Sequence, residues 1–229
     1  MNGVTNPVQH SGSAFSPVYQ IMFINHDPFL IIISSPSGAG KSTLCRMVVQ
    51  NDPLIKLSIS VTTRAQRPQE VQGQHYYFVS KSEFNIMVEK DELLEKADVF
   101  GNNYGTPKKL IEDELKNGNC VLFDIDWQGA RQIKEKFDSD SVVSIFILPP
   151  SIKELERRLR GRAQDPEEVV QGRMKKAQDE ISHFEEYDFI LINDDLNTTY
   201  NKIRSIIESK RSSRISKSDL KKFVSQNLN

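Results

Sequence analysis

The sequence predicts an α/β protein in which a parallel sheet is flanked by helices. From Phe29 onward, short apolar runs alternate with amphipathic helical patterns, as expected of βαβ units. A glycine-rich loop at 35–43 joins the first apolar run to the first helical pattern, which is the setting of a phosphate-binding loop. The segment 62–106 breaks the alternation with Arg, Gln, Gly and aromatic residues, so we expect it to form an inserted lobe.

Each element of this prediction has its own local signal. Four apolar runs are expected to form strands, at 29–34, 120–125, 142–148 and 189–192. Three polar sequences are expected to begin helices with a capping side chain, and in two of them a proline follows it. These sequences are Thr106 before Pro107, Ser151 with Glu154, and Asp165 with Pro166 and Glu168.

The remaining segments set the predicted domain organisation. Residues 1–27 show no apolar periodicity and are expected to be a mobile N-terminal extension, followed by one domain over 28–208. Within that domain, 159–172 is rich in arginine between two helical patterns and is predicted to be a mobile lid. Residues 209–229 are basic and polar and are predicted to be a solvated tail.

Composition excludes several classes of protein. With 38% hydrophobic and 27% charged residues, the 229-residue chain belongs to the soluble globular class. Its 30 basic and 31 acidic residues are balanced, so we expect neither nucleic acid nor a membrane as partner. The longest apolar run is too short to span a bilayer, and residues 1–40 contain no Lys or Arg, which argues against a secretory signal and an Arg-rich mitochondrial presequence. Cys45 and Cys120 are expected to be buried thiols of a cytoplasmic enzyme; a homo-oligomer remains open.

The glycine-rich loop predicts an ATP site. Its glycines let backbone N–H groups turn toward phosphate oxygens, and the helix that follows adds the positive end of its dipole. Lys41 would supply a cation for the phosphates, and Ser42 a hydroxyl for Mg²⁺. Ser35 stands where glycine is usual, which constrains the backbone but leaves these N–H groups able to bind phosphate. The loop comprises Ser35, Pro36, Ser37, Gly38, Ala39, Gly40, Lys41, Ser42 and Thr43.

An apolar run that ends in two carboxylates predicts the second half of a nucleotide site. Residues 121–126 place Asp124 and Asp126 on the same side of a strand, because strand side chains alternate between faces. Such a strand end typically holds magnesium through bound water, and we assign this role to Asp124. A phosphate-binding loop with an acidic strand is nevertheless shared by GTPases, ATPases and kinases.

Four motifs, including parts of this loop and this strand end, carry a family resemblance. They are Ser-Gly-Ala-Gly-Lys-Ser-Thr (37–43), Thr-Thr-Arg-Ala-Gln-Arg-Pro (62–68), Phe-Gly-Asn-Asn-Tyr-Gly-Thr (100–106) and Asp-Ile-Asp-Trp-Gln-Gly (124–129). Together they resemble the guanylate kinase family, and the resemblance extends from about 29 to about 208. It implies a P-loop kinase core, an inserted GMP-binding lobe and a lid that closes over ATP.

The resemblance also implies how GMP would be bound. Arg64, Arg67, Tyr76 and Tyr104 match the residues that hold its phosphate, which needs several donors. Glu95 matches the acid that reads the guanine edge, since one carboxylate can accept from both N1–H and the exocyclic amine. Ser60 and Thr106 match hydroxyl positions of that pocket, and Asp126 matches a carboxylate near the base and ribose.

Phosphoryl transfer to GMP needs no general base, because the acceptor is already an anion. By resemblance, Lys41, Arg158, Arg162 and Arg173 neutralise the transferring group together with Mg²⁺, giving GDP for purine metabolism. Asn103 and Ala163 depart from the family pattern but remove no assigned donor. The alternatives are a catalytically inactive binding module, which typically lacks these cations, a kinase for another monophosphate, and a regulatory GTPase.

Overall fold

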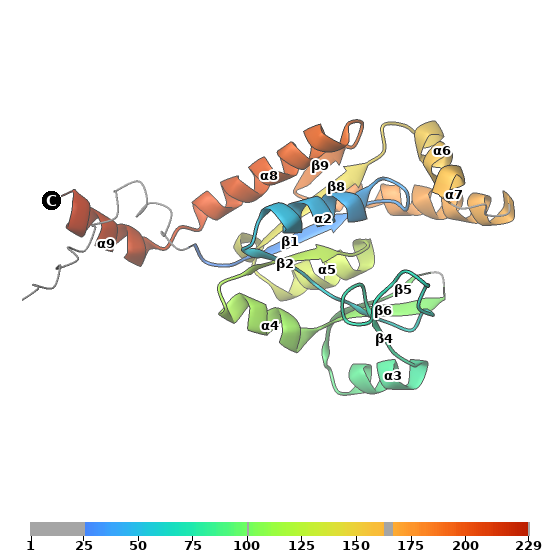
Figure 1. The fold of residues 1–229 in the computed structure, drawn as a ribbon, viewed down its shortest axis with the longest axis horizontal. Helices are drawn as coiled ribbons and strands as arrows, with labels where there is room; N and C mark the ends of the chain where they lie inside the picture. The colour runs from blue at the N-terminus through green and yellow to red at the C-terminus, as the bar shows by residue number, and fades with distance from the viewer. Residues whose placement is uncertain (1–25, 100, 163–166, 229) are drawn as a thin grey trace, which may run out of the picture.

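The structure, a computed structural model, describes residues 26–99, 101–162 and 167–228 (Figure 1). Its central sheet has the order β2-β7-β1-β8-β9, and all neighbouring strands run parallel. Parallel neighbours require crossover connections, which the helices between the strands supply. The strands of this sheet are β1 (Leu30–Ser34), β2 (Ile55–Leu57), β7 (Cys120–Asp124), β8 (Val142–Leu148) and β9 (Phe189–Ile192).

Helices cover both faces of the central sheet (Figure 1). Helices α2 (Lys41–Asn51) and α8 (Leu196–Ser213) pack on one face, and α4 (Lys108–Lys116) and α5 (Trp127–Lys136) pack on the other. Strand β1 is buried over its whole length, as expected of a parallel strand enclosed on two sides. Burial on both faces therefore explains why the core of β1 is an uninterrupted apolar run and not an alternating pattern.

The segment between β2 and α4 folds around a second, smaller sheet. Its order is β4-β3-β6-β5, with β6 antiparallel to both neighbours and β3 parallel to β4. Val61, Phe84 and Leu93 form a separate small core beneath it. Its elements are β3 (Val61–Thr62), β4 (Tyr77–Phe78), α3 (Lys81–Glu89), β5 (Leu93–Val99) and β6 (Asn102–Pro107).

A helical hairpin stands at one end of the molecule, beyond the carboxyl ends of the central strands (Figure 1). It consists of α6 (Ile152–Arg162) and α7 (Glu167–Ser182), which pack through Leu155, Leu159 and Ala177. The segment predicted to be a lid, 159–172, includes residues 163–166, which lie outside the described ranges. Short 3₁₀ turns, η1 (Ser139–Ser141) and η2 (Phe184–Glu186), precede β8 and β9.

Most of the predicted elements are confirmed, and one helix start was wrong. The four predicted strands are present to within one residue, and Ser151 accepts from the Glu154 N–H at 3.1 Å at the start of α6. Thr106, however, does not cap α4: it lies in β6 and binds Glu95, and Pro107 is the residue before the helix. The sequence pattern missed β2, which is too short for an apolar alternation. The predicted start at Asp165 and Pro166 lies outside the described part of the chain.

The start of the described chain meets the end of α8 on the side away from the hairpin. Asp27 donates its N–H to the carbonyl of Arg214 at 2.9 Å, and His26 bridges to Ile215. The segment predicted to be a tail contains the end of α8 and a separate helix, α9 (Lys217–Asn227). Residues 1–25 of the predicted extension lie outside the described ranges. None of the helices described combines the length and apolar composition that crossing a bilayer requires.

Candidate active site

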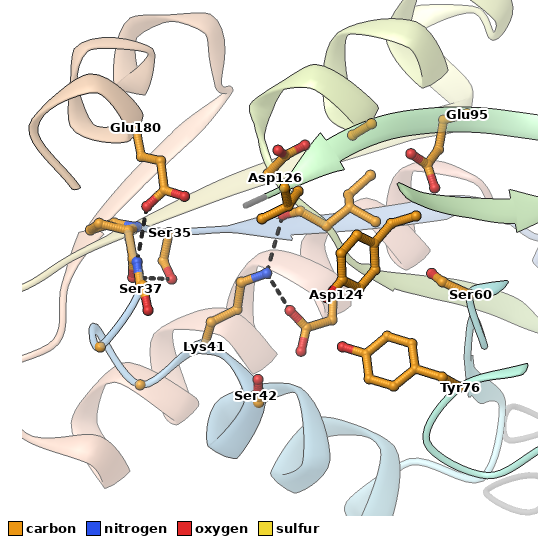
Figure 2. A pocket seen from close by; sticks show the side chains of 17 residues that line it. Ser35, Ser37, Lys41, Ser42, Ser60, Tyr76, Glu95, Asp124, Asp126 and Glu180 are labelled. Atoms are coloured by element: carbon orange, nitrogen blue, oxygen red, sulfur yellow. Dashed lines mark hydrogen bonds and ion pairs between the residues drawn. The ribbon is translucent and has the colours of Figure 1, made fainter. Parts of the chain in front are cut away.

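A cavity of about 280 Å³ lies between the phosphate-binding loop and the second sheet (Figure 2). Parallel strands present their carboxyl ends at one edge, and the loop after β1 and the end of β7 form one wall there. Strands β5 and β6 and the residues beside β3 and β4 form the opposite wall. The predicted site residues that line it are Ser35, Pro36, Ser37, Gly38, Gly40, Lys41, Ser42, Ser60, Tyr76, Glu95, Tyr104, Asp124 and Asp126.

The phosphate-binding loop takes a backbone course that requires its glycines. Gly38 and Gly40 have φ values of 96° and 102°, in the left-handed region that L side chains rarely adopt. A Cβ on Gly40 would also lie 2.5 Å from the amide nitrogen of Asn193. That amide donates to the carbonyl of Ala39 at 2.7 Å, so the end of β9 holds the loop from behind. Helix α2 begins at Lys41, whose side-chain amino group points into the cavity (Figure 2).

Lys41 and Asp124 face each other across the cavity floor (Figure 2). The ammonium pairs with the Asp124 carboxylate and donates to the carbonyl of Ile125 at 3.2 Å. Burial lowers the pKa of Lys41, but the Asp124 charge outweighs burial and leaves the pKa above its usual value. Lys41 is therefore a permanent cation beside the loop. Ser42 lines the same cavity from the first turn of α2.

Glu95 is a buried carboxylate at the far wall of the cavity. Its residue is 3% exposed, and its Oε1 accepts from the Thr106 hydroxyl at 2.7 Å. Burial raises the pKa of Glu95 to about 7, opposed by the Thr106 hydrogen bond. The Ser60 hydroxyl lies 3.4 Å from that of Thr106, so the three side chains form one polar row. A Cβ on Gly129 would lie 2.6 Å from Glu95 Oε2, so a larger residue there would force this carboxylate to move.

Asp126 lies beyond the end of β7 as the N-cap of α5. Its carboxylate accepts from the N–H groups of Gln128 and Gly129 at 3.1 and 3.2 Å, and from the Gln128 side chain at 3.0 Å. A capping aspartate also complements the positive end of the helix dipole. Asp124 and Asp126 thus line one cavity, as expected, although only Asp124 belongs to the strand.

Aromatic and cationic side chains gather beside the second sheet. The rings of Tyr76 and Tyr104 meet edge to face at 5.9 Å, and the Arg64 guanidinium lies 5.4 Å from the Tyr76 centroid. Glu70 binds this guanidinium at 2.7 Å and also accepts from the Arg67 N–H at 2.8 Å. The Arg64 contact lowers the pKa of Glu70. The Arg67 side chain is exposed on the same loop.

Among the lid arginines whose side chains the structure describes, Arg158 and Arg173 do not line this cavity. Arg158 binds Glu154 at 2.8 Å and donates to the carbonyl of Asn193 at 3.3 Å. It lines a second hollow, on the other side of the phosphate-binding loop beside Thr43. Arg173 is half-buried on α7. Arg162 ends α6, and its side chain lies outside the described part of the structure.

Comparisons with known proteins agree with this geometry. The family model for guanylate kinase matches residues 28–210. The chain is 53% identical over 195 residues to the guanylate kinase of Cereibacter sphaeroides, covering 85% of this chain and 92% of that one. The guanylate kinase of Rhodopseudomonas palustris is 50% identical over 195 residues, covering 85% and 88%. The crystal structure of guanylate kinase from Anaplasma phagocytophilum superimposes with a TM-score of 0.70 at 36% identity, covering 90% and 97%.

The chain belongs to the guanylate kinase family. The region matched by the guanylate kinase model contains both sheets, the hairpin and the whole cavity wall. The fold predicted from the sequence, a P-loop kinase core with a parallel sheet between helices, is confirmed.

Several residues contact site residues although the sequence assigned them no role, and Gly129, Asn193 and Glu70 are three of them. Gly129 lies in the Asp-Ile-Asp-Trp-Gln-Gly motif. The reason that a side chain is disfavoured there becomes visible only when the position of Glu95 is known. Asn193 follows an apolar strand at the carboxyl edge of the sheet, a position that could have marked it. Glu70 gave no comparable signal, because an acidic residue on a polar loop is usually solvated.

Proposed function

We propose that this chain transfers the γ-phosphoryl group of ATP directly to the phosphate of GMP, forming GDP and ADP, with the residue roles given below. The observation that carries the proposal is the cavity itself, whose one wall is a phosphate-binding loop and whose other wall presents a buried carboxylate. A phosphate-binding loop alone fits many nucleotide enzymes. A buried carboxylate that faces this loop and could bind a nucleobase fits a kinase whose acceptor is a nucleotide.

Glu95 is proposed to read the guanine base. Guanine presents two donors, N1–H and the exocyclic amine, and an ionised carboxylate can accept both. The Thr106 hydroxyl holds Oε1 and Ser60 lies beside it, so the carboxylate is already oriented before GMP arrives. Adenine would offer an unprotonated N1 to the same carboxylate, and an unpaired buried polar group is strongly rejected.

The phosphate of GMP is proposed to bind Arg64, Arg67, Tyr76 and Tyr104. The Arg64 guanidinium lies over the Tyr76 ring, and that ring meets the ring of Tyr104, which supports the proposal because one guanidinium and two phenols gather beside the second sheet. Glu70 occupies the Arg64 guanidinium in this structure, and a phosphate dianion would compete for the same donors. Asp126 is proposed to lie near the base and ribose from the other wall.

ATP is proposed to bind the loop at 35–43 as its magnesium complex. Ser42 and Asp124 would hold Mg²⁺, with Asp124 acting through water. They fit this ion because both line the cavity and both offer the hard oxygen ligands that Mg²⁺ prefers. When bound, the ion would neutralise the charge on the β- and γ-phosphates. Lys41 is proposed to leave its Asp124 partner in part and contact the phosphates.

Transfer then requires alignment and charge neutralisation. An oxygen of the GMP phosphate attacks the γ-phosphorus, and the bond from the γ-phosphorus to the bridging oxygen of ADP breaks in line. Lys41, Arg158, Arg162 and Arg173 are proposed to stabilise the charge shared by the two oxygens. Since Arg158 and Arg173 lie outside the cavity here, the proposal requires the hairpin α6–α7 to close over ATP.

A coupled assay tests the acceptor. ADP formation from ATP and Mg²⁺ is measured with GMP, AMP, UMP and TMP as acceptors at equal concentration. We expect GMP to be preferred by kcat/KM about 10,000-fold or more, the range that hydrogen-bonding pockets reach against analogues that leave them unpaired. Comparable turnover with AMP would contradict the role of Glu95, and turnover without any acceptor would indicate a hydrolase.

We further propose that the enzyme serves purine nucleotide metabolism in the cytoplasm. Cys45 and Cys120 are free and buried, as predicted, which suits a reducing compartment. Fractionation of cells followed by a GMP kinase assay of each fraction tests this location.

A further inference from the structure

Glu180, on α7, is a buried carboxylate that the proposed reaction does not use. Its residue is 7% exposed, and its Oε2 accepts from the backbone N–H of Ser37 at 3.0 Å (Figure 2). The two residues are 143 positions apart in the sequence, so the bond joins the hairpin directly to the phosphate-binding loop. Glu180 also lines the cavity that holds Lys41 and Asp126.

The surroundings of Glu180 disfavour the ionised form of its carboxyl group. Burial raises the pKa of this carboxyl, and the hydrogen bond from Ser37, with the charges of Lys176 and Lys41, opposes that rise only in part. A buried acid with a raised pKa tends to reduce stability at neutral pH. Stability alone therefore does not account for an acid at this position, and its contact with the loop is the feature to explain.

The hairpin rests on the phosphate-binding loop through a second, apolar contact. A Cβ on Gly38 would lie 3.0 Å from Leu155 Cδ1 and 3.1 Å from Leu159 Cδ2, so α6 packs closely over the loop. The same two leucines pack against Ala177 of α7. Helix α6 thus contacts Gly38 and α7 contacts Ser37, so both helices of the hairpin pack against the phosphate-binding loop.

Helical geometry relates Glu180 to the proposed catalytic arginine of α7. Arg173 precedes Glu180 by seven residues, which is two turns or about 10 Å along one face of the helix. A bond at Glu180 therefore restricts the rotation and the axial position of α7 near the end that joins the core. The face that carries Arg173 is turned toward the same side as the bonded carboxylate.

We propose that Glu180 is a positioning residue that anchors the end of α7 on the phosphate-binding loop and so keeps Arg173 directed toward the transferring phosphoryl group when the hairpin closes. The bond links the loop that holds ATP to the helix that must approach it. This inference rests on the proposed role of Arg173 in the reaction. Glu180 itself touches no reacting atom.

A double-mutant cycle on the full chain tests this coupling. The variants are Glu180→Ala, Arg173→Met and the double variant, each assayed for kcat and for the KM of GMP and ATP. We expect Glu180→Ala alone to lower kcat by about ten-fold or more with the KM of GMP nearly unchanged, since alignment and not acceptor binding is lost. In the Arg173→Met background the same substitution should lower kcat by less than about two-fold, because residues that act as a unit are not additive.

Two further variants separate positioning from folding. Glu180→Gln keeps an acceptor oxygen for the Ser37 N–H, so we expect it to recover most of the kcat that alanine loses. Asp179→Asn, at the exposed neighbouring position of α7, should match the wild type. Melting curves of all variants identify any that fail to fold, and the Gln variant then carries the test.

The outcomes distinguish this inference from the proposed function. If Arg173→Met keeps wild-type kcat, the proposed role of Arg173 fails and this inference loses its basis. If Arg173→Met loses activity but the two substitutions lower kcat independently, Glu180 does not act through Arg173 and the inference is overturned. A glutamine variant as impaired as alanine would likewise overturn the anchoring bond.

Discussion

Replacing Glu95 by glutamine separates recognition of the base from stability of the fold. The amide offers one acceptor oxygen, whereas the guanine edge presents two donors, so one donor must face an N–H₂ group. A misfitted buried polar contact costs on the order of 1–3 kcal/mol, which corresponds to a roughly ten- to hundred-fold loss of kcat/KM for GMP. The KM for ATP should change little, because Glu95 lies on the opposite wall from the phosphate-binding loop.

The same substitution should increase stability at alkaline pH. Burial raises the pKa of Glu95 in the folded chain to about 7, above the 4.5 of a free side chain. Between these values the folded state binds a proton that the unfolded state has lost, so wild-type stability falls as pH rises from about 4.5 through 7. A shift of this size corresponds to about 3 kcal/mol by pH 8. The neutral amide avoids this loss and can still bond to Thr106.

Two measurements on one protein preparation test this reasoning. Steady-state kinetics with GMP and ATP varied separately give the change in specificity, and urea unfolding at pH 5 and pH 8 gives the change in stability. We expect Glu95→Gln to be much less active with GMP yet more resistant to urea than the wild type at pH 8, with the gain largely absent at pH 5. Wild-type kcat/KM for GMP would refute the role of Glu95 in reading the base. An equal stability difference at both pH values would refute the raised pKa.

Three other predictions concern the loop, the helix behind Glu95 and the N-terminal extension. Lys41→Met should lower kcat about 100-fold or more, because it removes a cation from the transferring phosphoryl group. The melting temperature should stay near that of the wild type, because Asp124 remains partly solvated. Turnover within a few-fold of wild type would contradict this prediction. Gly129→Ala should displace Glu95 and reduce kcat/KM for GMP, although alanine itself stabilises the helix by about 1 kcal/mol relative to glycine. Unchanged GMP kinetics would show that the carboxylate can shift without losing its function. Deleting residues 1–20 should leave activity and Tm nearly unchanged, because that stretch shows no core-forming pattern, and a Tm lowered by more than about 5 °C would mean that it packs on the enzyme.

Elements with strong local signals were predicted well from the sequence. Strand β1 is buried on both faces, and its five consecutive apolar or small residues reveal this directly. The loop that follows has glycines where the backbone adopts positive φ, and its motif marks it without any knowledge of the fold. Strand β2 was missed because three residues carry no periodicity, and Thr106 was misread because its hydroxyl satisfies Glu95 across the sheet instead of the helix that follows.

By itself, the sequence determined the fold class, the phosphate-binding loop, the acidic strand end and, through its motifs, the family of this chain. These features follow from residues close together in the chain, whose backbone and periodicity requirements are local. Only the tertiary structure decided that a Cβ at Gly129 would force Glu95 to move, and that Glu180 bonds to Ser37. Both contacts join segments far apart in the sequence, so neither exists until the sheets and helices have packed, and no local pattern can encode which distant side chain will fill a given space.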